Sequence, residues 1–458
     1  MKYSRSETHC KTHSIPVLRF EDQRLTSFSG LVILQALVCR LQLKERLRAC
    51  FRHLQVHSIF GHATIVLQLV LHVLMGYREL RDSRYYRDDP LVKRVLGLSR
   101  LPDVATISRA LAEADERSAE NVRRIVRSLV LERLVQLALS CVTLDFDGSV
   151  LSTRRRAEGT APGYNKKKKG ERSYYPLFCT LAQTGQVVDV LHRSGNVHDS
   201  NGAKAFILAC IREVRAVLPH VRIEVRMDAA FFSDEIVSEL HRQGIEFTIS
   251  VPFERFVELK GMIENRRHWR RFHDEWSYFE TPWKPKVWDR RFRFVFIRKR
   301  VKQQQKGPVQ LDLFIPYEHG YEFKVIVTNK RVRVKKVLAF HNGRGAQEGV
   351  LGELKSQVQA DYVPVRGWIG NRLWLLAGIL AHNLMREMQM VAQPKARGTT
   401  EKRATLWVFE QATTIRRNLL QRAGRLTNPR GRLTLTMSAN AAVKEQMLHY
   451  LRFLKKSA

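Results

Sequence analysis

Two strand-like runs of this sequence each end in an aspartate. Residues 141–147 read Cys-Val-Thr-Leu-Asp-Phe-Asp and end at Asp147, and residues 221–228 close on Arg-Met-Asp at Asp228. A third acid, Glu348, lies where the apolar residues follow a helical spacing. Folds gather carboxylates from separate strands and helices around hard cations, which prefer oxygen ligands. The pattern favours an α/β fold that brings three acidic side chains to one site.

The first strand offers two candidate ligands. Asp145 and Asp147 point to the same face of the strand, because Phe146 lies between them. We expect one of them to bind a metal ion and the other to support it. The alternation alone leaves both assignments open.

The helical segment around Glu348 groups opposite charges on one face. Arg344, Glu348 and Lys355 are spaced i, i+4 and i+11, so an anion is flanked by two cations. The carboxylate suits a metal ion and the cations suit the phosphates of a nucleic-acid strand. Glu353 is the second choice as a ligand, since five residues turn it about 140° away on a helix.

Three such carboxylates can hold two Mg2+ ions, for which Mn2+ can substitute. In phosphoryl transfer one ion activates the attacking hydroxyl and the other stabilises the leaving oxygen, so no side-chain nucleophile is required. The sequence has neither a Gly-x-Ser-x-Gly run nor a Gly-x-x-x-x-Gly-Lys-Ser/Thr loop. We therefore expect metal-dependent chemistry on a phosphodiester, without a nucleotide cofactor.

The charge of the chain indicates a polyanionic partner. Its 458 residues carry a formal net charge of +35, and 44% of them are hydrophobic. This combination describes a folded protein with a positive surface rather than a disordered basic tail. Nucleic acid is the favoured partner, because many phosphate contacts release counterions together. Charge alone leaves a basic housekeeping protein as the alternative.

The sequence predicts a cytoplasmic, nucleoid-associated protein. Its six cysteines are scattered without a Cys-x-x-Cys pair, which fits a reducing compartment. Residues 1–19 contain no apolar core segment of a secretory signal. The apolar stretches 65–75 and 373–384 are too short or too interrupted to span a bilayer. No membrane segment is expected.

Residues 1–140 have helical periodicity and form an expected helical DNA-binding domain. Residues 101–115 read as a turn, a cap at Asp103 or Thr106, and a short helix carrying Ser108 and Arg109. This order is typical of the second half of a helix-turn-helix, and an ordinary helical hairpin explains it equally well.

Residues 141–253 predict three meandering strands followed by alternating helices and strands, which is the order of a ribonuclease H-like core. Residues 321–390 complete this catalytic core. Residues 254–320 form a β-rich insertion in which Arg alternates with Phe, so we expect a small sheet with one apolar and one basic face, or aromatic side chains that simply pack together. Residues 391–458 form a basic C-terminal region suited to phosphate contacts.

The third acidic region resembles that of the DDE transposases of bacterial insertion sequences. The group it resembles carries Tyr-x2-Arg-x3-Glu-x6-Lys, and this chain has the same spacings in His341, Arg344, Glu348 and Lys355, with histidine in place of tyrosine. The stretch around Asp228 and residues 163–170, 173–177 and 193–196 are similar to members of insertion-sequence family 1380. The resemblance covers roughly residues 30–435.

The resemblance implies an enzyme that binds the terminal inverted repeats of an insertion sequence, nicks DNA and transfers the strand to target DNA, working as a homodimer. It implies that Asp147, Asp228 and Glu348 are catalytic and bind the metal ions. Asp147 matches the first aspartate better than Asp145 because Gly148 and Ser149 follow it; Asp145 remains the reserve ligand or a supporting group. The DNA-binding residues expected from the motifs and from charge are Arg344, Lys355, His341, Arg226, Lys166, Lys167, Lys168 and Lys169.

Two other functions remain open at this stage. A nuclease of the same fold would cut DNA without joining it to a target. A transposase-derived DNA-binding protein would have lost catalysis, although the three carboxylates and Lys355 argue against that loss.

Overall fold

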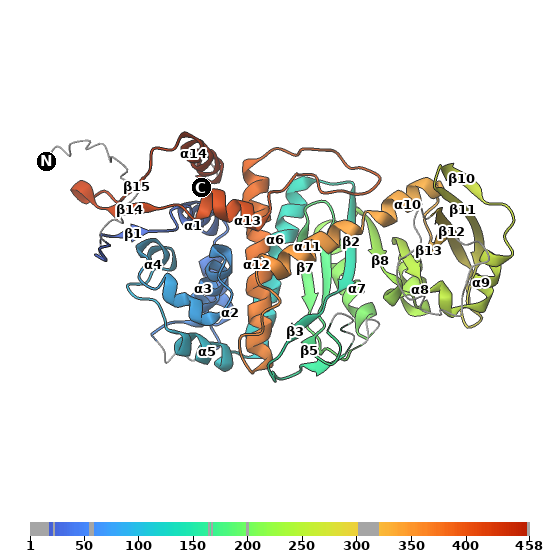
Figure 1. Ribbon diagram of the computed structural model, residues 1–458, viewed down its shortest axis with the longest axis horizontal. Coiled ribbons are helices and arrows are strands. Elements are labelled where there is room, and N and C mark those ends of the chain that lie inside the picture. Colours follow the sequence, from blue (N-terminus) through green and yellow to red (C-terminus); the bar gives the residue numbers. More distant parts are fainter. Residues whose placement is uncertain are drawn as a thin grey trace, which may run out of the picture.

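A mixed sheet of nine strands runs from the centre of the molecule to one end (Figure 1). The computed structural model describes residues 18–21, 23–54, 59–163, 165, 168–197, 201–300 and 320–455. The strand order is β10-β11-β12-β13-β9-β8-β2-β6-β7. The strands are β2 (Cys141–Gly148), β6 (Leu177–Leu181), β7 (Gln186–Leu191), β8 (Arg222–Met227), β9 (Glu246–Val251), β10 (Arg270–His273), β11 (Trp276–Trp283), β12 (Phe292–Arg300) and β13 (Tyr321–Thr328).

The central half of the sheet follows the order predicted from the sequence. Strands β2, β6 and β7 form an antiparallel meander, and β8 and β9 then join on the other side of β2 in parallel. Helices α7 (Ala203–Val217) and α8 (Asp234–Arg242) make the two crossovers. Strand β2 is buried along most of its length, as expected for a central strand covered on both faces.

The predicted insertion continues this sheet rather than forming a sheet of its own. Strand β13 pairs with β9, and β12, β11 and β10 follow in antiparallel order. Helix α9 (Val257–Glu264) lies within the same segment. The sheet is therefore continuous between the strands of the predicted core and those of the predicted insertion, which begins after residue 253.

The predicted open basic face of the insertion is absent from β12, within the residues that the structure describes. Phe294 and Phe296 are buried on one side, and Val295 and Ile297 are buried on the other, where they pack with Val334 and its neighbours. The aromatic side chains pack together: the Phe279 and Phe296 rings stack at 4.3 Å, and Trp283 meets Phe294 edge-on at 4.9 Å. The second of the two sequence interpretations is the one that fits the structure.

Helices form the other end of the molecule (Figure 1). They are α1 (Leu31–Arg40), α2 (Leu43–Cys50), α3 (His62–Met75), α4 (Pro90–Leu96) and α5 (Val104–Glu113), while α6 (Glu116–Leu137) lies beside β7 nearer the middle of the molecule. Asp103 caps α5 as predicted, because its carboxylate accepts a hydrogen bond from the Thr106 N–H at 2.8 Å. Asp89 and Asp115 cap α4 and α6 in the same way.

Helix α12 (Trp368–Ala392) joins the helical end to the sheet. It packs against α3 and α5 of the helical end and against α6 and β7. Almost all of its residues are buried, and one hydrophobic cluster extends through it from Phe28 to Leu454. Within the described parts of the chain, no helix is long and apolar enough to cross a membrane.

The basic C-terminal region is part of this helical end, not a separate unit. Strand β14 (Gly424–Thr427) pairs with β1 (Leu25–Thr26) and β15 (Thr434–Met437), and α14 (Ala441–Lys455) packs on α1 and α12. Arg416, one of its basic residues, is buried and donates hydrogen bonds to the carbonyls of Leu74 and Val73. It supports the fold and does not present its charge to a phosphate.

Candidate active site

Polar side chains follow one face of two neighbouring parallel strands. The register of β2 and β8 pairs Thr143 with Glu224 and Asp145 with Arg226. The final pair of this register, Phe146 with Met227, makes Asp147 and Asp228 the next residues of the two strands. The two predicted aspartates therefore lie at the C-terminal ends of adjacent strands. Carboxylates in this position repel each other unless a cation lies nearby.

The structure separates the two aspartates of β2 by depth. Asp145 is buried and faces Arg226 in a two-pronged ion pair, with the Arg226 Nε at 2.5 Å and Nη2 at 2.7 Å from its oxygens. Asp147, two residues further on, is partly exposed. Since a buried carboxylate already paired with a guanidinium is a poor ligand for an incoming ion, the geometry favours Asp147 as the ligand and gives Asp145 a supporting role.

Arg344 links the acids of the sheet to the acid of the helix. It precedes α11 (Gly345–Ser356), and its Nη1 lies 3.2 Å from the Asp147 Oδ2. Its Nη2 lies 3.4 Å from the Glu348 Oε1, one helical turn later. One guanidinium thus contacts two of the three predicted carboxylates and offsets part of their negative charge. The Gln347 amide donates to the Asp145 carbonyl at 2.9 Å and fixes α11 against β2.

Asp228 begins the turn that follows β8. Its carboxylate accepts a hydrogen bond from the Ala230 N–H at 3.0 Å, which caps the short helix η2 (Ala229–Phe231). This contact orients the side chain at the strand end, next to Asp147 in the register. Its capping role and a role as a ligand are compatible, because a carboxylate has a second oxygen.

The chemistry of this donor set fits a divalent cation, although its arrangement does not yet form a closed metal site. All three predicted ligands are carboxylates, which suit Mg2+ or Mn2+. Across the described ranges, no group of three or more His, Cys, Asp or Glu side chains is placed to hold a metal ion. Between Asp147 and Glu348 the positive charge is supplied by Arg344.

Glu353, the second choice as a ligand, has a structural role. It is buried, forms an ion pair with Arg386 of α12, and accepts a hydrogen bond from the Ala412 N–H at 2.9 Å. Glu348, by contrast, keeps 65% of its side chain exposed. This difference agrees with the prediction that Glu353 points away from the face of the helix that carries Glu348.

Two residues expected to contact DNA lie in the interior. Arg226 is fully buried, and besides Asp145 it donates to the carbonyls of Phe340 at 3.0 Å and Lys402 at 2.7 Å. His341 is buried between Thr248 and Ser250, with its nitrogens 3.1 and 2.9 Å from their hydroxyls. Neither side chain reaches a surface where a DNA strand could bind. Both instead hold α10 (Val334–Asn342) on the sheet and so fix the start of α11.

The other predicted DNA contacts are exposed or lie outside the described residues. Lys355 is partly exposed in the last turn of α11. Lys168 is mostly exposed, 3.4 Å from Glu171, and Lys169 is exposed beside it. Lys166 and Lys167 lie outside the residues that the structure describes. The phosphate contacts of these lysines stay predictions.

Lys324 is a residue of this site that sequence reasoning missed. It lies on β13, and its ammonium donates to the Asn342 side chain at 3.3 Å, just before Arg344. Burial, together with the positive charge of Arg344, lowers the pKa of Lys324 to about 8. A lysine followed directly by the apolar run of residues 325–327 is the signal in the sequence that marks such a position.

The family of this chain is shown by its sequence. Residues 9–458 match the family described as "Transposase DDE domain group 1", and the chain belongs to that family. A comparison with curated proteins gave no match.

Two solved transposase structures match the chain at low similarity. The piggyBac transposase in a synaptic complex with hairpin DNA is 12% identical, with a TM-score of 0.43, over 86% of this chain and 79% of that one. The Mos1 transposase in a paired-end complex with the left transposon end is 10% identical, with a TM-score of 0.18, over 43% of this chain and 60% of that one.

Proposed function

We propose that this chain is the transposase of a bacterial insertion sequence of the family 1380 type. It binds the terminal inverted repeats as a homodimer, cleaves DNA with a divalent metal ion and transfers the strand to target DNA in the bacterial cytoplasm. The observation that carries this proposal is the meeting of Asp147, Arg344 and Glu348 beside Asp228. Membership of the transposase family supports it.

We further propose that the five strands in the order β7-β6-β2-β8-β9 are a ribonuclease H-like core. An antiparallel meander with two parallel strands added beside its first strand supports this assignment. In this arrangement the first two acids come from the first and fourth strands of the core, and the third comes from a helix after the inserted strands.

Asp147, Asp228 and Glu348 would hold the divalent ions, which supply positive charge for the attacking and leaving oxygens of the phosphodiester. Arg344 offsets part of the negative charge of Asp147 and Glu348 and so lowers the repulsion between carboxylates that lie close together. Its guanidinium can instead bind a phosphate of the DNA, and Lys355, eleven residues later on the same helix, can bind a second one. These two cations would orient the scissile strand along α11.

A strand-transfer assay tests this function. The substrate is a duplex that ends in the inverted repeat found beside the gene, incubated with a target plasmid and Mg2+. We expect Asp147→Asn, Asp228→Asn and Glu348→Gln each to lower cleavage by about 1000-fold, or about 4 kcal/mol in activation free energy, because each removes a charged ligand.

The matched control is Glu322→Gln, which removes an exposed carboxylate from β13 and should leave cleavage unchanged. Cleavage without any joined product would identify a nuclease instead of a transposase. DNA binding with no cleavage by the unmodified protein would identify a transposase-derived binding protein. Cleavage that persists in the three variants would remove these carboxylates from the mechanism.

A further inference from the structure

A basic groove lies between helix α5 and two segments, residues 155–156 and residues 364–367. Its volume is about 830 Å3, and the described residues that line it include three arginines and no acid. We call it the α5 groove and define it by Ser108, Ala112, Arg155, Arg156, Pro364, Val365, Arg366 and Gly367.

Helix α5 forms one wall of the α5 groove. Ser108 and Ala112 are one turn apart and therefore share a face of the helix. Ala112 is exposed, Ser108 is partly exposed, and both side chains are small. A bulky ligand can therefore approach this helix closely.

The opposite wall is held in place by hydrogen bonds. Arg155, in the segment after β3 (Leu151–Thr153), donates to the Pro364 carbonyl at 2.6 Å and to the Tyr362 hydroxyl at 3.2 Å. The backbone N–H and carbonyl of Val365 are both bonded to the Asn371 side chain, at 3.2 and 3.0 Å. A wall fixed in this way needs little reorganisation to receive a ligand.

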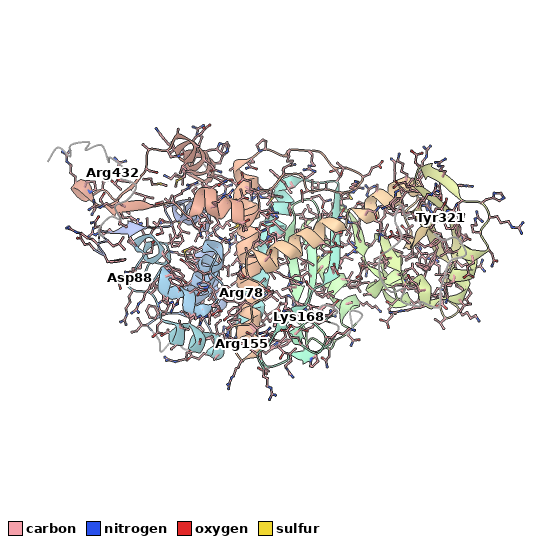
Figure 2. All side chains as sticks on the ribbon, in the orientation of Figure 1. Arg78, Asp88, Arg155, Lys168, Tyr321 and Arg432 are labelled. Atoms are coloured by element: carbon pink, nitrogen blue, oxygen red, sulfur yellow. The ribbon has the colours of Figure 1, made fainter. Side chains whose placement is uncertain are left out.

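Two further arginines supply charge to the α5 groove. Arg156 and Arg366 are both exposed. The nearest acid in the sequence, Glu158, accepts a hydrogen bond from the Trp368 N–H at 2.8 Å, and its own N–H donates to the Arg366 carbonyl. In Figure 2, Arg155 lies toward the same edge of the molecule as Lys168, so positive charge continues along this edge.

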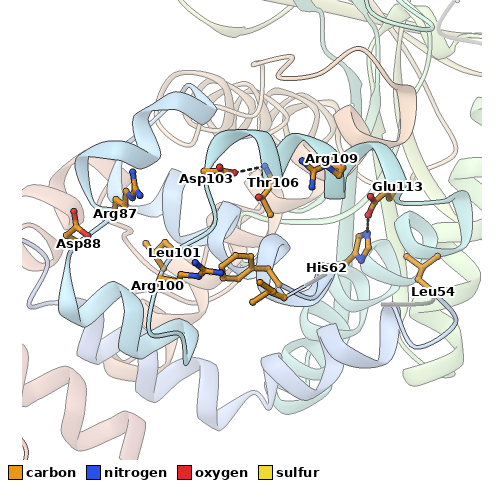
Figure 3. Close-up of a pocket in the computed structure, with 12 residues that line it drawn as sticks. Leu54, His62, Arg87, Asp88, Arg100, Leu101, Asp103, Thr106, Arg109 and Glu113 are labelled. Carbon is orange, nitrogen blue, oxygen red and sulfur yellow. Dashed lines mark hydrogen bonds and ion pairs between the residues drawn. The ribbon is translucent and has the colours of Figure 1, made fainter. Parts of the chain in front are cut away.

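A second hollow beside α5 has a different character. It has a volume of about 780 Å3, and Figure 3 shows Arg87, Arg100 and Arg109 in it together with Asp88 and other acids. Of these acids, Asp103 caps α5 and Glu113 lies 3.7 Å from His62. Mixed charge there favours the α5 groove as the site for a polyanion.

The α5 groove is tied by short chain segments to the candidate active site. Eight residues separate Asp147 from Arg155, which limits their separation to about 29 Å for a fully extended chain. At 3.4 Å per base pair this distance corresponds to at most about eight base pairs of duplex. A duplex whose cleaved phosphate lies at Asp147 and which runs toward α5 would therefore reach the groove within this length.

We propose that the α5 groove binds the phosphate backbone of double-stranded DNA within about one helical turn of the cleavage point, with α5 against the duplex. This inference rests on the proposed function, because it takes the cleaved phosphate to lie at the carboxylates. Charge complementarity, the small residues of α5 and the fixed opposite wall support duplex DNA as the ligand.

The test uses a double variant that carries both Arg156→Gln and Arg366→Gln. Its affinity for DNA is compared with that of the unmodified full chain, in the absence of metal ions. Affinity for the inverted-repeat duplex should fall roughly 10-fold, and the slope of log affinity against log salt should decrease by about 2. Hydroxyl-radical protection should disappear within about eight base pairs of the cleavage point. Arg156→Lys with Arg366→Lys should retain most of the affinity, since it keeps the charge.

The matched control, Arg212→Gln with Arg242→Gln, removes the same charge from exposed positions on α7 and α8. The proposal would be overturned if the groove variant and the control variant lost equal DNA affinity. It would also be overturned if the slope of log affinity against log salt were unchanged in the groove variant. A loss confined to single-stranded DNA would overturn it as well. Failure of the unmodified chain to bind any duplex would contradict the proposed function itself. If the unmodified chain cleaves DNA but the Arg156 and Arg366 variants bind DNA with unchanged affinity, only the proposal about the α5 groove is contradicted.

Discussion

Single residues show how depth decides the role of a side chain in this protein. Asp145 and Asp147 share one face of β2, yet only Asp145 is buried in an ion pair with Arg226. Arg344 keeps part of its surface exposed and contacts two carboxylates at the edge of the sheet. A difference of two positions along one strand thus separates a buried ion pair from a partly exposed carboxylate.

His192 is a buried residue whose polar atoms lack partners. Its ring stacks on Trp368 at 4.4 Å with an interplanar angle of 9° and meets Tyr174 edge-on. Among the described residues neither ring nitrogen has a hydrogen-bond partner. Burial, assisted by the charge of Arg372, lowers the pKa of His192 to about 3, so the ring is neutral.

We expect His192→Phe to raise the free energy of unfolding by about 1–2 kcal/mol at pH 7, because the ring stack remains and two unsatisfied nitrogens are removed. Urea unfolding measures this change. The same substitution at the exposed His220 is the control and should change stability by less than about 0.5 kcal/mol. A loss of stability in His192→Phe would show that the nitrogens are satisfied in solution.

At the scale of elements, the polar face of β8 organises what packs on the sheet. The Glu224 carboxylate on this strand accepts hydrogen bonds from Lys330 at 2.7 Å, from Arg403 at 2.8 Å and from the Thr143 hydroxyl at 3.1 Å. Burial alone would raise the pKa of Glu224, but hydrogen bonds from Arg403 and Lys330 outweigh it and hold the pKa well below its usual range. The carboxylate thereby attaches the segment after α12 to β8.

Glu224→Gln should lower the free energy of unfolding by about 3 kcal/mol at pH 7, because Arg403 loses its counter-charge and Lys330 keeps only Glu246. The loss should shrink as the pH falls below the ordinary Glu pKa of about 4.3, because the carboxylate of the unfolded chain then takes up a proton that the native Glu224, with its depressed pKa, does not. Urea unfolding at several pH values checks both points. The control is Arg222→Gln, which alters an exposed partner of the same carboxylate; an equal loss there would contradict the explanation.

At the scale of the whole molecule, α12 makes the helical end and the central strands one folded unit. It carries the neutral His382, whose Nε2 lies 3.0 Å from the Gly185 carbonyl, and it packs near His72 of α3 through Trp374. Burial lowers the pKa of both His382 and His72 to about 4. Burial also lowers the pKa of His341 well below its usual value.

These pKa values predict destabilisation by mild acid. A histidine whose folded pKa is depressed contributes stability above its unfolded pKa, near 6.5, and this contribution is lost as the pH falls toward the folded pKa. With His72, His192, His341 and His382, we expect a loss of about 1 kcal/mol each, or roughly 4 kcal/mol together, between pH 7 and pH 5.5. Unfolding in urea at these two pH values measures it.

His192→Phe provides the control for this pH dependence, because it removes one of the four groups. The loss on acidification should then be about one quarter smaller. Stability that is flat between pH 7 and pH 5.5 would contradict neutral burial of these histidines.

The sequence alone was enough to place most helices and strands and to predict the order of the central strands. Alternation along residues 141–147 and the apolar run before Asp228 each locate the end of a strand, and the i, i+4, i+11 spacing places Arg344 and Lys355 on the face of Glu348. These features are local, because side-chain direction follows from backbone periodicity. The helical period also predicts, for the same reason, that Glu353 points away from Glu348.

Only the tertiary structure decided which of these polar residues are accessible. Arg226 and His341 carry the residue types of a DNA contact, but the segment around Lys402, together with Phe340 and strand β9, covers them. The joining of the insertion to β9 and the meeting of α5 with residues 364–367 likewise depend on segments distant in sequence. Periodicity fixes the face on which a side chain lies, whereas its depth depends on what other parts of the chain pack over that face.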